Sequence, residues 1–381
     1  MAKKVLFVDD EPNVLQSIRR SLRKVFDVDT AEGGQEALEM IEANGSYAVI
    51  VSDMRMPGMN GVEFLSEAKR CAPDTVRMML TGNADQQTAV DAVNHGDIFR
   101  FLNKPCAADE LTSALNGGIR QHELITAEKE LLEQTLRGSI DALANVLALS
   151  NPEVFGSTSR SKQRVHHIAK HMNLEQNWIY ESAAMLCKIG CIAISEDLVR
   201  RKVGGHKLDA GEYAEFAEHA TIGAKLVSTI PRMEDVARAI QYQEKCYDGS
   251  GFPKDGVSGA DIPLGGRMLK VVLDYDAIEA SGAQMTEAIE RLNSTPEKYD
   301  PQVLVAFEES MLADQGLVLS TVSIMQLDDS MIVAEDLKTE EGVLLIAKGQ
   351  ETTLSVRRHL QKYRDKGLIG SDVVVRHPAA V

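Results

Sequence analysis

Acidic residues follow two of the short apolar segments in the N-terminal third of the chain. Asp9 and Asp10 come directly after residues 5–8, and Asp53 follows residues 48–51 with one residue between. Carboxylate oxygens grouped in this way can hold Mg²⁺. The metal would neutralise charge on an incoming phosphoryl group, and a lone carboxylate such as that of Asp53 could attack the phosphorus.

Two further residues could hold the oxygens of the transferred phosphoryl group. Thr81 follows the apolar run 78–80, and Lys104 lies just after the run 99–102. A hydroxyl and an ammonium group both donate hydrogen bonds to phosphate oxygens. The residue types therefore predict phosphoryl transfer to Asp53, with Thr81 and Lys104 as its partners in catalysis.

These five residues require a scaffold that gathers them. Apolar runs at 5–8, 48–51, 78–80 and 99–102, and a weaker strand signal at 25–28, alternate with helical stretches such as 13–23 and 35–42. The alternation predicts an α/β domain with a doubly wound parallel sheet of five strands. Ligands of such sheets bind at the carboxyl ends of the strands, which is where the acids fall.

With these residues in place, the first 120 or so positions resemble the receiver domain of two-component response regulators. The matching stretches are 8–11, 52–61, 80–82 and 103–105. The resemblance implies that Asp53 takes phosphate from a cognate histidine kinase. It also implies that Asp10 and Asp53 ligate Mg²⁺ with the Met54 carbonyl, that Asp9 acts through water, and that Phe101 repacks when Thr81 moves.

A long helix is expected over residues 107–149. Its apolar positions recur at intervals of three and four residues. This spacing suits either a dimerising coiled coil or a helix docked on the domain that follows. The positions are Leu132, Leu136, Ile140, Leu143 and Leu147.

The middle of the chain, about 150–315, has helical periodicity and resembles the HD-GYP family of metal-dependent cyclic-di-GMP phosphodiesterases. The loop at 248–253 and the segment at 262–267 match the family well. Most of the family's metal-ligand positions, however, carry other residues. His219 is kept, whereas the other positions are occupied by Ser161, Cys187, Lys188, Gln243, Glu244 and Leu273.

This ligand count predicts that the HD-type metal centre is absent. Two or three metals need several neutral imidazoles and bridging carboxylates. Lys188 stands where the bridging aspartate would be, and an ammonium group repels cations and has no lone pair. We therefore expect that this domain is not an enzyme. The alternative is a phosphodiesterase with a rearranged metal centre around His219, Glu244 and Asp248.

Two other ligands can be considered for this domain. The first is zinc, which three thiols and one imidazole could bind, from Cys187, Cys191, Cys246 and His219. Cysteines in such positions are, however, more commonly small buried hydrophobic residues without a metal. Cyclic-di-GMP could bind without being cut, with Arg267, Phe252 and Gly251 as contacts implied by the resemblance, and Arg201 or Lys202 as further phosphate partners. The Lys of the family's name motif is Cys191 here.

Composition excludes several classes of function. The net charge of −16 opposes binding to DNA or to anionic lipid surfaces. No stretch approaches the ~20 apolar residues of a membrane span, and the N-terminus is too polar for a signal peptide, so we expect a cytoplasmic protein. The five cysteines form no secretory disulfide framework.

The sequence therefore predicts a phosphorylation-controlled response regulator with a non-enzymatic output. The output would act by protein interaction or by rearrangement of a homodimer, on a downstream partner that the sequence does not name. We expect a receiver at 1–118, a connecting helix at 119–150, a degenerate, all-α HD-GYP-like domain at 151–318 and a small α+β appendage at 319–381. The alternatives are a phosphodiesterase with a rearranged metal site and a cyclic-di-GMP-sensing module.

Overall fold

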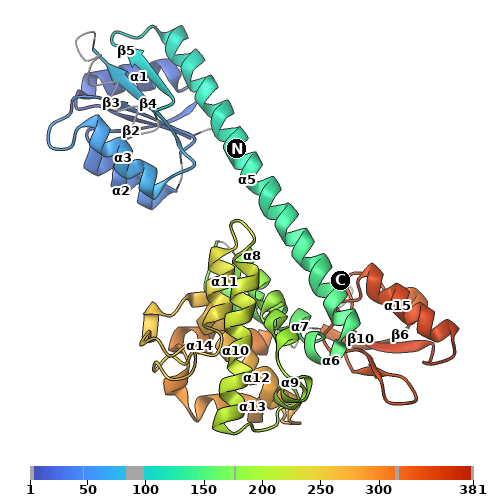
Figure 1. The fold of residues 1–381 in the computed structure, drawn as a ribbon. Coiled ribbons are helices and arrows are strands. Elements are labelled where there is room, and N and C mark those ends of the chain that lie inside the picture. The colour runs from blue at the N-terminus through green and yellow to red at the C-terminus, as the bar shows by residue number, and fades with distance from the viewer. Residues whose placement is uncertain (1–3, 46, 83–97, 176, 314–316, 379–381) are drawn as a thin grey trace. The chain divides into compact units, whose positions relative to one another are not determined.

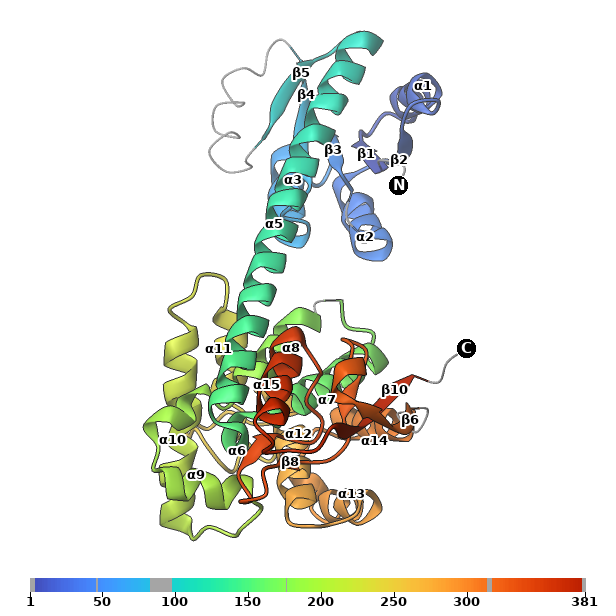
Figure 2. The ribbon, with the colours of Figure 1, turned by 90° about the vertical axis from the view of Figure 1, so that its right-hand side faces the viewer.

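The computed structural model describes residues 4–45, 47–82, 98–175, 177–313 and 317–378. The chain forms two compact units, residues 1–135 and 136–381. Figures 1 and 2 show the elements of each unit. No helix among the described residues is both long enough and apolar enough to span a bilayer.

The first unit is built on a five-stranded parallel sheet with the strand order β2-β1-β3-β4-β5, which confirms the predicted α/β fold. Its strands are β1 (Lys4–Val8), β2 (Asp27–Ala31), β3 (Val49–Asp53), β4 (Val76–Thr81) and β5 (Arg100–Asn103). Its helices are α1 (Pro12–Leu22), α2 (Gly34–Asn44), α3 (Gly61–Cys71) and the first part of α5 (Ala108–Ser150).

Alternation along the strands supplies both faces of this sheet with apolar side chains. Val5 and Phe7 of β1 pack with α1 and α5, whereas Leu6 and Val8 pack with α2 and α3. Both faces of a parallel sheet are buried in this arrangement, so the strand interiors are almost wholly apolar. The sheet is therefore a rigid platform for whatever stands at its carboxyl edge.

One predicted strand lies elsewhere. The run at 25–28 is replaced by β2 at Asp27–Ala31, and Val25 is 62% exposed. Val25 N donates instead to the carbonyl of Leu22 at 2.9 Å, closing the turn after α1. The strand begins where Lys4 of β1 can pair with Asp27.

The second unit holds a helical domain and a small antiparallel β-sheet part, in agreement with the predicted all-α domain and α+β appendage. The helical domain continues from α5 through α6 (Pro152–Phe155), α7 (Thr158–His171), α8 (Asn177–Leu186), α9 (Glu196–Val203), α10 (Ala210–Val227), α11 (Glu234–Gln241), α12 (Leu264–Ala280), α13 (Met285–Asn293) and α14 (Pro301–Ala313). Short 3₁₀ turns lie at η1 (Ile189–Ala193), η2 (Gly259–Asp261) and η3 (Pro296–Lys298).

Residues 317–378 are called the C-terminal module below. It has a sheet of order β6-β10-β7, a separate β8-β9 pair and helix α15, which packs on its own small core. The bounds are β6 (Leu317–Ser323), η5 (Ile324–Gln326), β7 (Ile332–Val333), β8 (Leu337–Lys338), β9 (Leu344–Ile346), α15 (Leu354–Asp365) and β10 (Asp372–Pro378).

The second half of α5 docks on the helical domain, which is one of the two readings of its periodicity. Ile140 and Ala144 are buried in the main core of this domain. Ala148 is buried in a second cluster with Val154 and Phe155. Leu143, by contrast, is 44% exposed, so the described residues leave its side chain partly open to solvent.

A close backbone approach fixes η1 against α10. A Cβ atom on Gly190 would clash with the carbonyl oxygen of His219 and would lie 2.7 Å from the amide nitrogen of Gly223. Backbone atoms cannot move aside as a flexible side chain can, so only glycine fits at this crossing. The crossing also sets the position of His219 relative to the segment that carries Lys188.

We expect Gly190→Ala to lower the free energy of unfolding of the second unit by about 1–3 kcal/mol, because the added methyl group overpacks a backbone contact. The melting temperature of this unit in calorimetry checks the prediction. Gly138→Ala is the matched control, because Gly138 lies in α5 with open space around it. That change should be neutral or stabilising, and equal effects of the two variants would contradict the packing argument.

Candidate functional site

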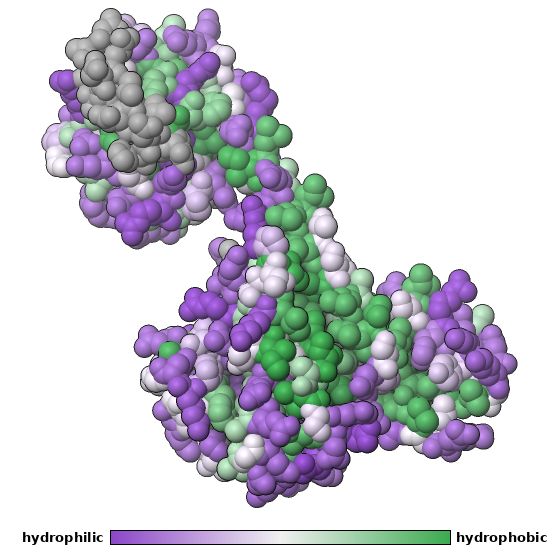
Figure 3. All heavy atoms as spheres, in the orientation of Figure 1, coloured by the Kyte–Doolittle hydropathy of each residue, from purple (hydrophilic) through white to green (hydrophobic). Residues whose placement is uncertain are grey.

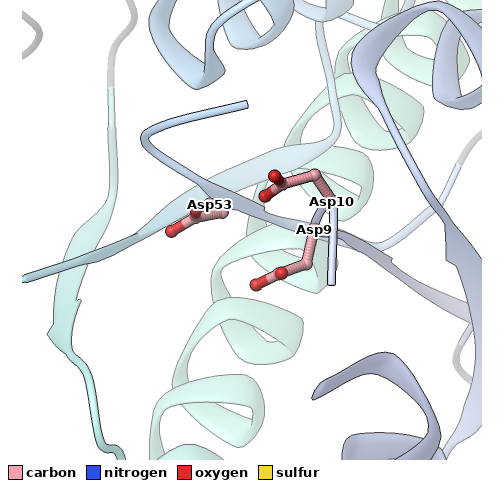
Figure 4. A group of neighbouring side chains, drawn as sticks. All are labelled: Asp9, Asp10 and Asp53. Atoms are coloured by element: carbon pink, nitrogen blue, oxygen red, sulfur yellow. The ribbon is translucent and has the colours of Figure 1, made fainter. Parts of the chain in front are cut away.

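Three carboxylates meet at the carboxyl edge of the receiver sheet. Asp9 and Asp10 follow β1 and Asp53 ends β3, and one ligand oxygen from each lies within 4.8 Å of the others (Figure 4). Asp9 is 1% exposed and Asp53 is 9% exposed, whereas Asp10 is open to solvent. The structure thus brings together the acids that the sequence singled out.

Lys104 joins this group from the end of β5. Its Nζ atom lies 2.6 Å from Asp9 Oδ2 and 2.8 Å from Asp53 Oδ1. Burial lowers the pKa of Lys104, but hydrogen bonds to Asp53 and then to Asp9 outweigh burial and hold the pKa above its usual value. The ammonium group therefore keeps its charge beside the predicted phosphoacceptor.

Thr81 and Phe101 lie on the neighbouring strands. Thr81 is buried at the end of β4, and its carbonyl accepts a hydrogen bond from Lys104 N at 2.8 Å. Phe101 is half-buried and pairs with Met79 in the β4–β5 register. Thr81 thus ends its strand at the sheet edge that carries the acids, and Phe101 lies on the neighbouring strand β5.

In the turn after Asp53, the backbone at Gly61 comes close to the backbone of Asp53 and Met54. Gly61 N donates to the Met54 carbonyl at 3.0 Å, and a Cβ atom on Gly61 would clash with the carbonyl oxygen of Asp53. Asn60 caps α3 by accepting hydrogen bonds from Val62 and Glu63. The Met54 oxygen has a second lone pair, and its expected role as a Mg²⁺ ligand beside the carboxylates stays a prediction.

A cavity of about 170 Å³ lies in the helical domain at the positions where the metal ligands were expected. Of those positions, Lys188, His219, Glu244 and Leu273 line it, together with Cys191, whereas Ser161, Cys187 and Gln243 lie outside its lining. Residues far apart in the sequence therefore converge as the resemblance implied. The atoms that they present, however, differ from those of a metal centre.

His219 is buried with both ring nitrogens engaged. Its Nδ1 lies 2.7 Å from the Phe216 carbonyl, so Nδ1 carries the proton and Nε2 is the acceptor. The amide nitrogen of Gln243 lies 3.1 Å from that Nε2 and also donates to the Cys187 carbonyl at 2.9 Å. Burial lowers the pKa of His219, so the ring is neutral and its lone pair is occupied by an amide.

Lys188 occupies the expected carboxylate position. Its Nζ atom donates to the Ser157 hydroxyl at 2.6 Å, and no carboxylate of the described residues lies within 4.0 Å of it. Burial lowers the pKa of Lys188. A hydroxyl partner satisfies one of its three hydrogens and supplies no counter-charge.

Ser161, at another expected ligand position, belongs to a buried ionic network. It donates to Asp276 Oδ2 at 2.7 Å, and Asp276 also pairs with Arg164. Arg164 pairs with Glu279 at 2.8 Å and stacks over the Tyr275 ring at 4.5 Å. This network takes up the oxygen atoms on its side of the cavity.

The stability of this network should depend on acid pH. Burial raises the pKa of Glu279, but Arg164 outweighs it and lowers the pKa from 4.5 to about 2. A carboxylate whose pKa is lower in the folded state than in the unfolded state stabilises the fold at pH values above the unfolded-state pKa. This stabilisation is lost as the pH falls through the folded-state pKa. We therefore expect the melting temperature of the second unit to fall as the pH drops from about 4.5 towards about 2.

Glu279→Gln should flatten that pH dependence, because an amide does not titrate in this range. Glu290→Gln, a change at an exposed position on α13, is the control and should keep the parent slope. An unchanged slope in Glu279→Gln would show that other groups carry the acid sensitivity.

The alternative metal sets are not assembled. Among the described residues, Asp9, Asp10 and Asp53 form the one group of potential ligands within 4.8 Å, and neither the cysteines with His219 nor the set of His219, Glu244 and Asp248 does so. Burial raises the pKa of Cys187 to about 11 and that of Cys191 to about 12. Both thiols are therefore protonated at neutral pH in the metal-free protein.

Of the residues expected to contact a nucleotide, Lys202 lines the cavity, whereas Arg201, Arg267, Phe252 and Gly251 lie outside its lining. Arg267 pairs with Asp300 and donates from Nε to the Ile262 carbonyl at 2.9 Å. Gly251 adopts a left-handed φ of 86°, and Phe252 precedes a cis proline. Their role in nucleotide binding stays a prediction.

Sequence reasoning named Lys202 as a further phosphate partner, and Lys202 of α9 lines the cavity and stacks over the Tyr213 ring at 5.4 Å. It missed another part of the cavity wall, which is formed by Asp336, Leu344 and Ala347 of the C-terminal module. No motif or periodicity marks such residues, because only the tertiary packing brings the module to the cavity.

Comparison with known proteins agrees with both halves of the chain. The family profile of the response regulator receiver domain matches residues 5–116, and that of the HD domain matches residues 141–303. A solved receiver domain protein of Clostridium thermocellum is 35% identical and covers 33% of this chain and 99% of that one, with a TM-score of 0.31.

Three curated relatives illustrate the range of similarity. The cyclic di-GMP phosphodiesterase response regulator RpfG of Xanthomonas campestris is 30% identical over 72% of this chain and 77% of its own length. The cyclic di-GMP phosphodiesterase of Thermotoga maritima is 28% identical over 80% and 89%. The hydrogenase transcriptional regulatory protein HoxA of Cupriavidus necator is 30% identical over 45% of this chain and 32% of its own.

This chain thus spans about a third of HoxA and three quarters or more of the two phosphodiesterases. The order of the two matched domains is that of a receiver followed by an output domain. The chain therefore belongs to the family of response regulators with an HD output domain that includes RpfG.

Proposed function

We propose that Asp53 is phosphorylated by a cognate histidine kinase and that the HD domain transmits this signal without catalysing a reaction. The observation that carries the first part is the contact between Lys104 Nζ and Asp53 Oδ1 at 2.8 Å. A fixed cation beside a carboxylate holds the developing negative charge of a phosphoryl group. Asp9 and Asp10 complete the set.

In this proposal an Asp53 carboxylate oxygen attacks the phosphorus atom while the bond to the leaving group of the donor breaks. Lys104 and Thr81 would donate hydrogen bonds to the phosphoryl oxygens. Asp9, Asp10, Asp53 and the Met54 carbonyl would hold Mg²⁺, which supplies charge neutralisation when bound. Movement of Thr81 towards the phosphoryl group would leave room for Phe101 to repack.

The non-enzymatic output is supported by the hydrogen bond from Gln243 to His219 and by the ammonium group of Lys188. A metal-activated water needs ligands with accessible lone pairs and a negative environment. The kept histidine has its lone pair occupied, and a cation replaces the expected bridging carboxylate. We therefore expect no hydrolysis by the route that the HD-GYP resemblance implies.

The test is hydrolysis of cyclic-di-GMP by the beryllofluoride-activated full chain, supplied with Mn²⁺ or Fe²⁺. We expect no turnover above the level of His219→Ala. Turnover that His219→Ala abolishes would contradict the proposal and establish an enzyme with an unusual centre. Titration calorimetry on the same sample tests the remaining alternative, a cyclic-di-GMP-sensing module. Such a module would bind the nucleotide without cutting it.

The phosphodiesterase alternative is kept because of the relatives. Both RpfG and the Thermotoga maritima protein are named cyclic di-GMP phosphodiesterases, and their similarity to this chain extends over most of its length. The assay above decides between the two functions directly.

We also propose that the chain forms a homodimer through α5. Large apolar side chains are exposed on this helix, with Leu124 at 65%, Leu131 at 67% and Val146 at 59%. Figure 3 displays apolar surface along α5. Leu124 and Leu131 are one heptad apart, as in a coiled-coil seam. Light scattering should give a dimer, and Leu131→Glu should shift it towards monomer.

A further inference from the structure

The cavity in the helical domain has a second wall from the C-terminal module. The helical domain contributes Arg160, Lys188 and Lys202, and the module contributes Asp336, Leu344 and Ala347. Its volume of about 170 Å³ is below the ~300–1,000 Å³ typical of sites for larger organic ligands. The space therefore suits a compact ligand.

The module is held in place at this wall by specific contacts. Arg160 Nη1 donates to the Lys348 carbonyl at 3.0 Å, and Lys348 Nζ pairs with Glu279 at 3.2 Å. Gly349 packs against the Arg160 side chain. β9 lies against α6. The same arginine thus faces the cavity and anchors the module.

The carboxylates that line the cavity already have partners. Asp274 pairs with Lys270 at 2.9 Å and accepts from the Tyr299 hydroxyl at 3.0 Å. Glu244 accepts from the Tyr213 hydroxyl at 2.6 Å. The remaining acids are likewise engaged: Asp276 with Ser161 and Arg164, Glu153 with Arg200 at 3.0 Å, and Asp336 with Lys348 N at 2.9 Å.

The cationic groups are less well satisfied. Lys188 has the Ser157 hydroxyl as its hydrogen-bond acceptor, and Lys202 stacks over the Tyr213 and Phe216 rings at 5.4 and 6.0 Å. Arg160 Nε is buried without a hydrogen-bond acceptor among the described residues, although Asp276 and Glu279 lie 3.7 and 3.8 Å away. Buried donors and charges without acceptors are costly, so a site of this kind favours a ligand that supplies them.

We propose that the cavity binds a compact oxyanion, either a phosphate or a small carboxylate, between Lys188, Lys202 and Arg160 beneath the β8–β9 pair. The ligand oxygens would accept hydrogen bonds from the two ammonium groups and from the guanidinium, which suits planar and tetrahedral oxyanions. Binding would also tie the C-terminal module to the helical domain through Arg160. This proposal does not depend on phosphorylation of Asp53.

The test is titration calorimetry of the unphosphorylated full chain, in EDTA so that the receiver holds no Mg²⁺. Inorganic phosphate and acetate are the two probes, and the tighter of them identifies the class of anion. We expect Lys188→Met to weaken binding roughly tenfold or more, because it removes a charged hydrogen-bond donor. Lys202→Met should weaken it as well.

Lys207→Met is the matched control, because Lys207 is exposed and does not line the cavity. The Lys207→Met protein should bind phosphate and acetate with the affinity of the parent chain. Circular dichroism should confirm that all three variants are folded. The proposal is overturned if neither anion binds the parent chain, or if Lys188→Met and Lys202→Met bind as tightly as Lys207→Met.

Discussion

Asp53→Asn should abolish phosphorylation of the chain by acetyl phosphate. The amide is nearly the same size as the carboxylate, so the contact with Lys104 is the main structural change, but an amide oxygen is too weak a nucleophile to form the acyl phosphate. Lys104→Met should slow the reaction about tenfold or more, because it removes a charge-assisted hydrogen bond. Phosphate-affinity electrophoresis of the treated protein measures both effects.

Asp27→Asn is the control for this experiment, since Asp27 is an exposed acid at the start of β2. It should be phosphorylated at the parent rate. If the Asp53→Asn protein still gains phosphate at that rate, then Asp53 is not the phosphoacceptor and the assignment of the site is wrong.

Asp276→Ala should lower the free energy of unfolding of the second unit by about 3–5 kcal/mol. The change leaves the buried Arg164 guanidinium without one of its two carboxylate partners and leaves the Ser161 hydroxyl without its acceptor. Uncompensated buried charge is among the most destabilising outcomes of a single substitution. The midpoint of urea unfolding, followed by a probe in the second unit, gives the measurement.

A surface pair provides the comparison for this prediction. Glu287 pairs with Arg291 on α13, and both side chains are 51% exposed. Glu287→Ala should cost at most about 0.5 kcal/mol, because solvent screens the pair. Similar losses in the two variants would mean that the Arg164 network contributes no more than an ordinary surface pair.

The receiver could be predicted almost completely from its sequence. Asp9 and Asp53 each end a strand that is apolar on both faces, and parallel strands gather their carboxyl ends at one edge. β2 was misplaced for a physical reason. Its residues Asp27–Ala31 include polar side chains, such as Asp29, which accepts from the Tyr47 hydroxyl at 2.8 Å, so hydrophobicity does not mark the strand.

The second unit was predictable in outline and less so in its contacts. The sequence shows that Gln243 replaces an expected histidine, but only the structure shows its amide bonded to His219. The contribution of Ala347 to the cavity had no sequence signal, because it depends on where a separate module packs. Local patterns specify elements, whereas such contacts arise from the whole fold.

The hydrogen bond between Gln243 and His219 also bears on how this domain could change over generations. Gln243→His alone would remove the amide that serves both His219 and the Cys187 carbonyl. Lys188 would still repel a metal ion, so the single change would lose a contact and gain no centre. Lys188→Asp alone would remove a cation that faces the cavity, while the lone pair of His219 would still be occupied by the Gln243 amide. Either single replacement would therefore lose an existing contact or charge without completing a metal-binding set.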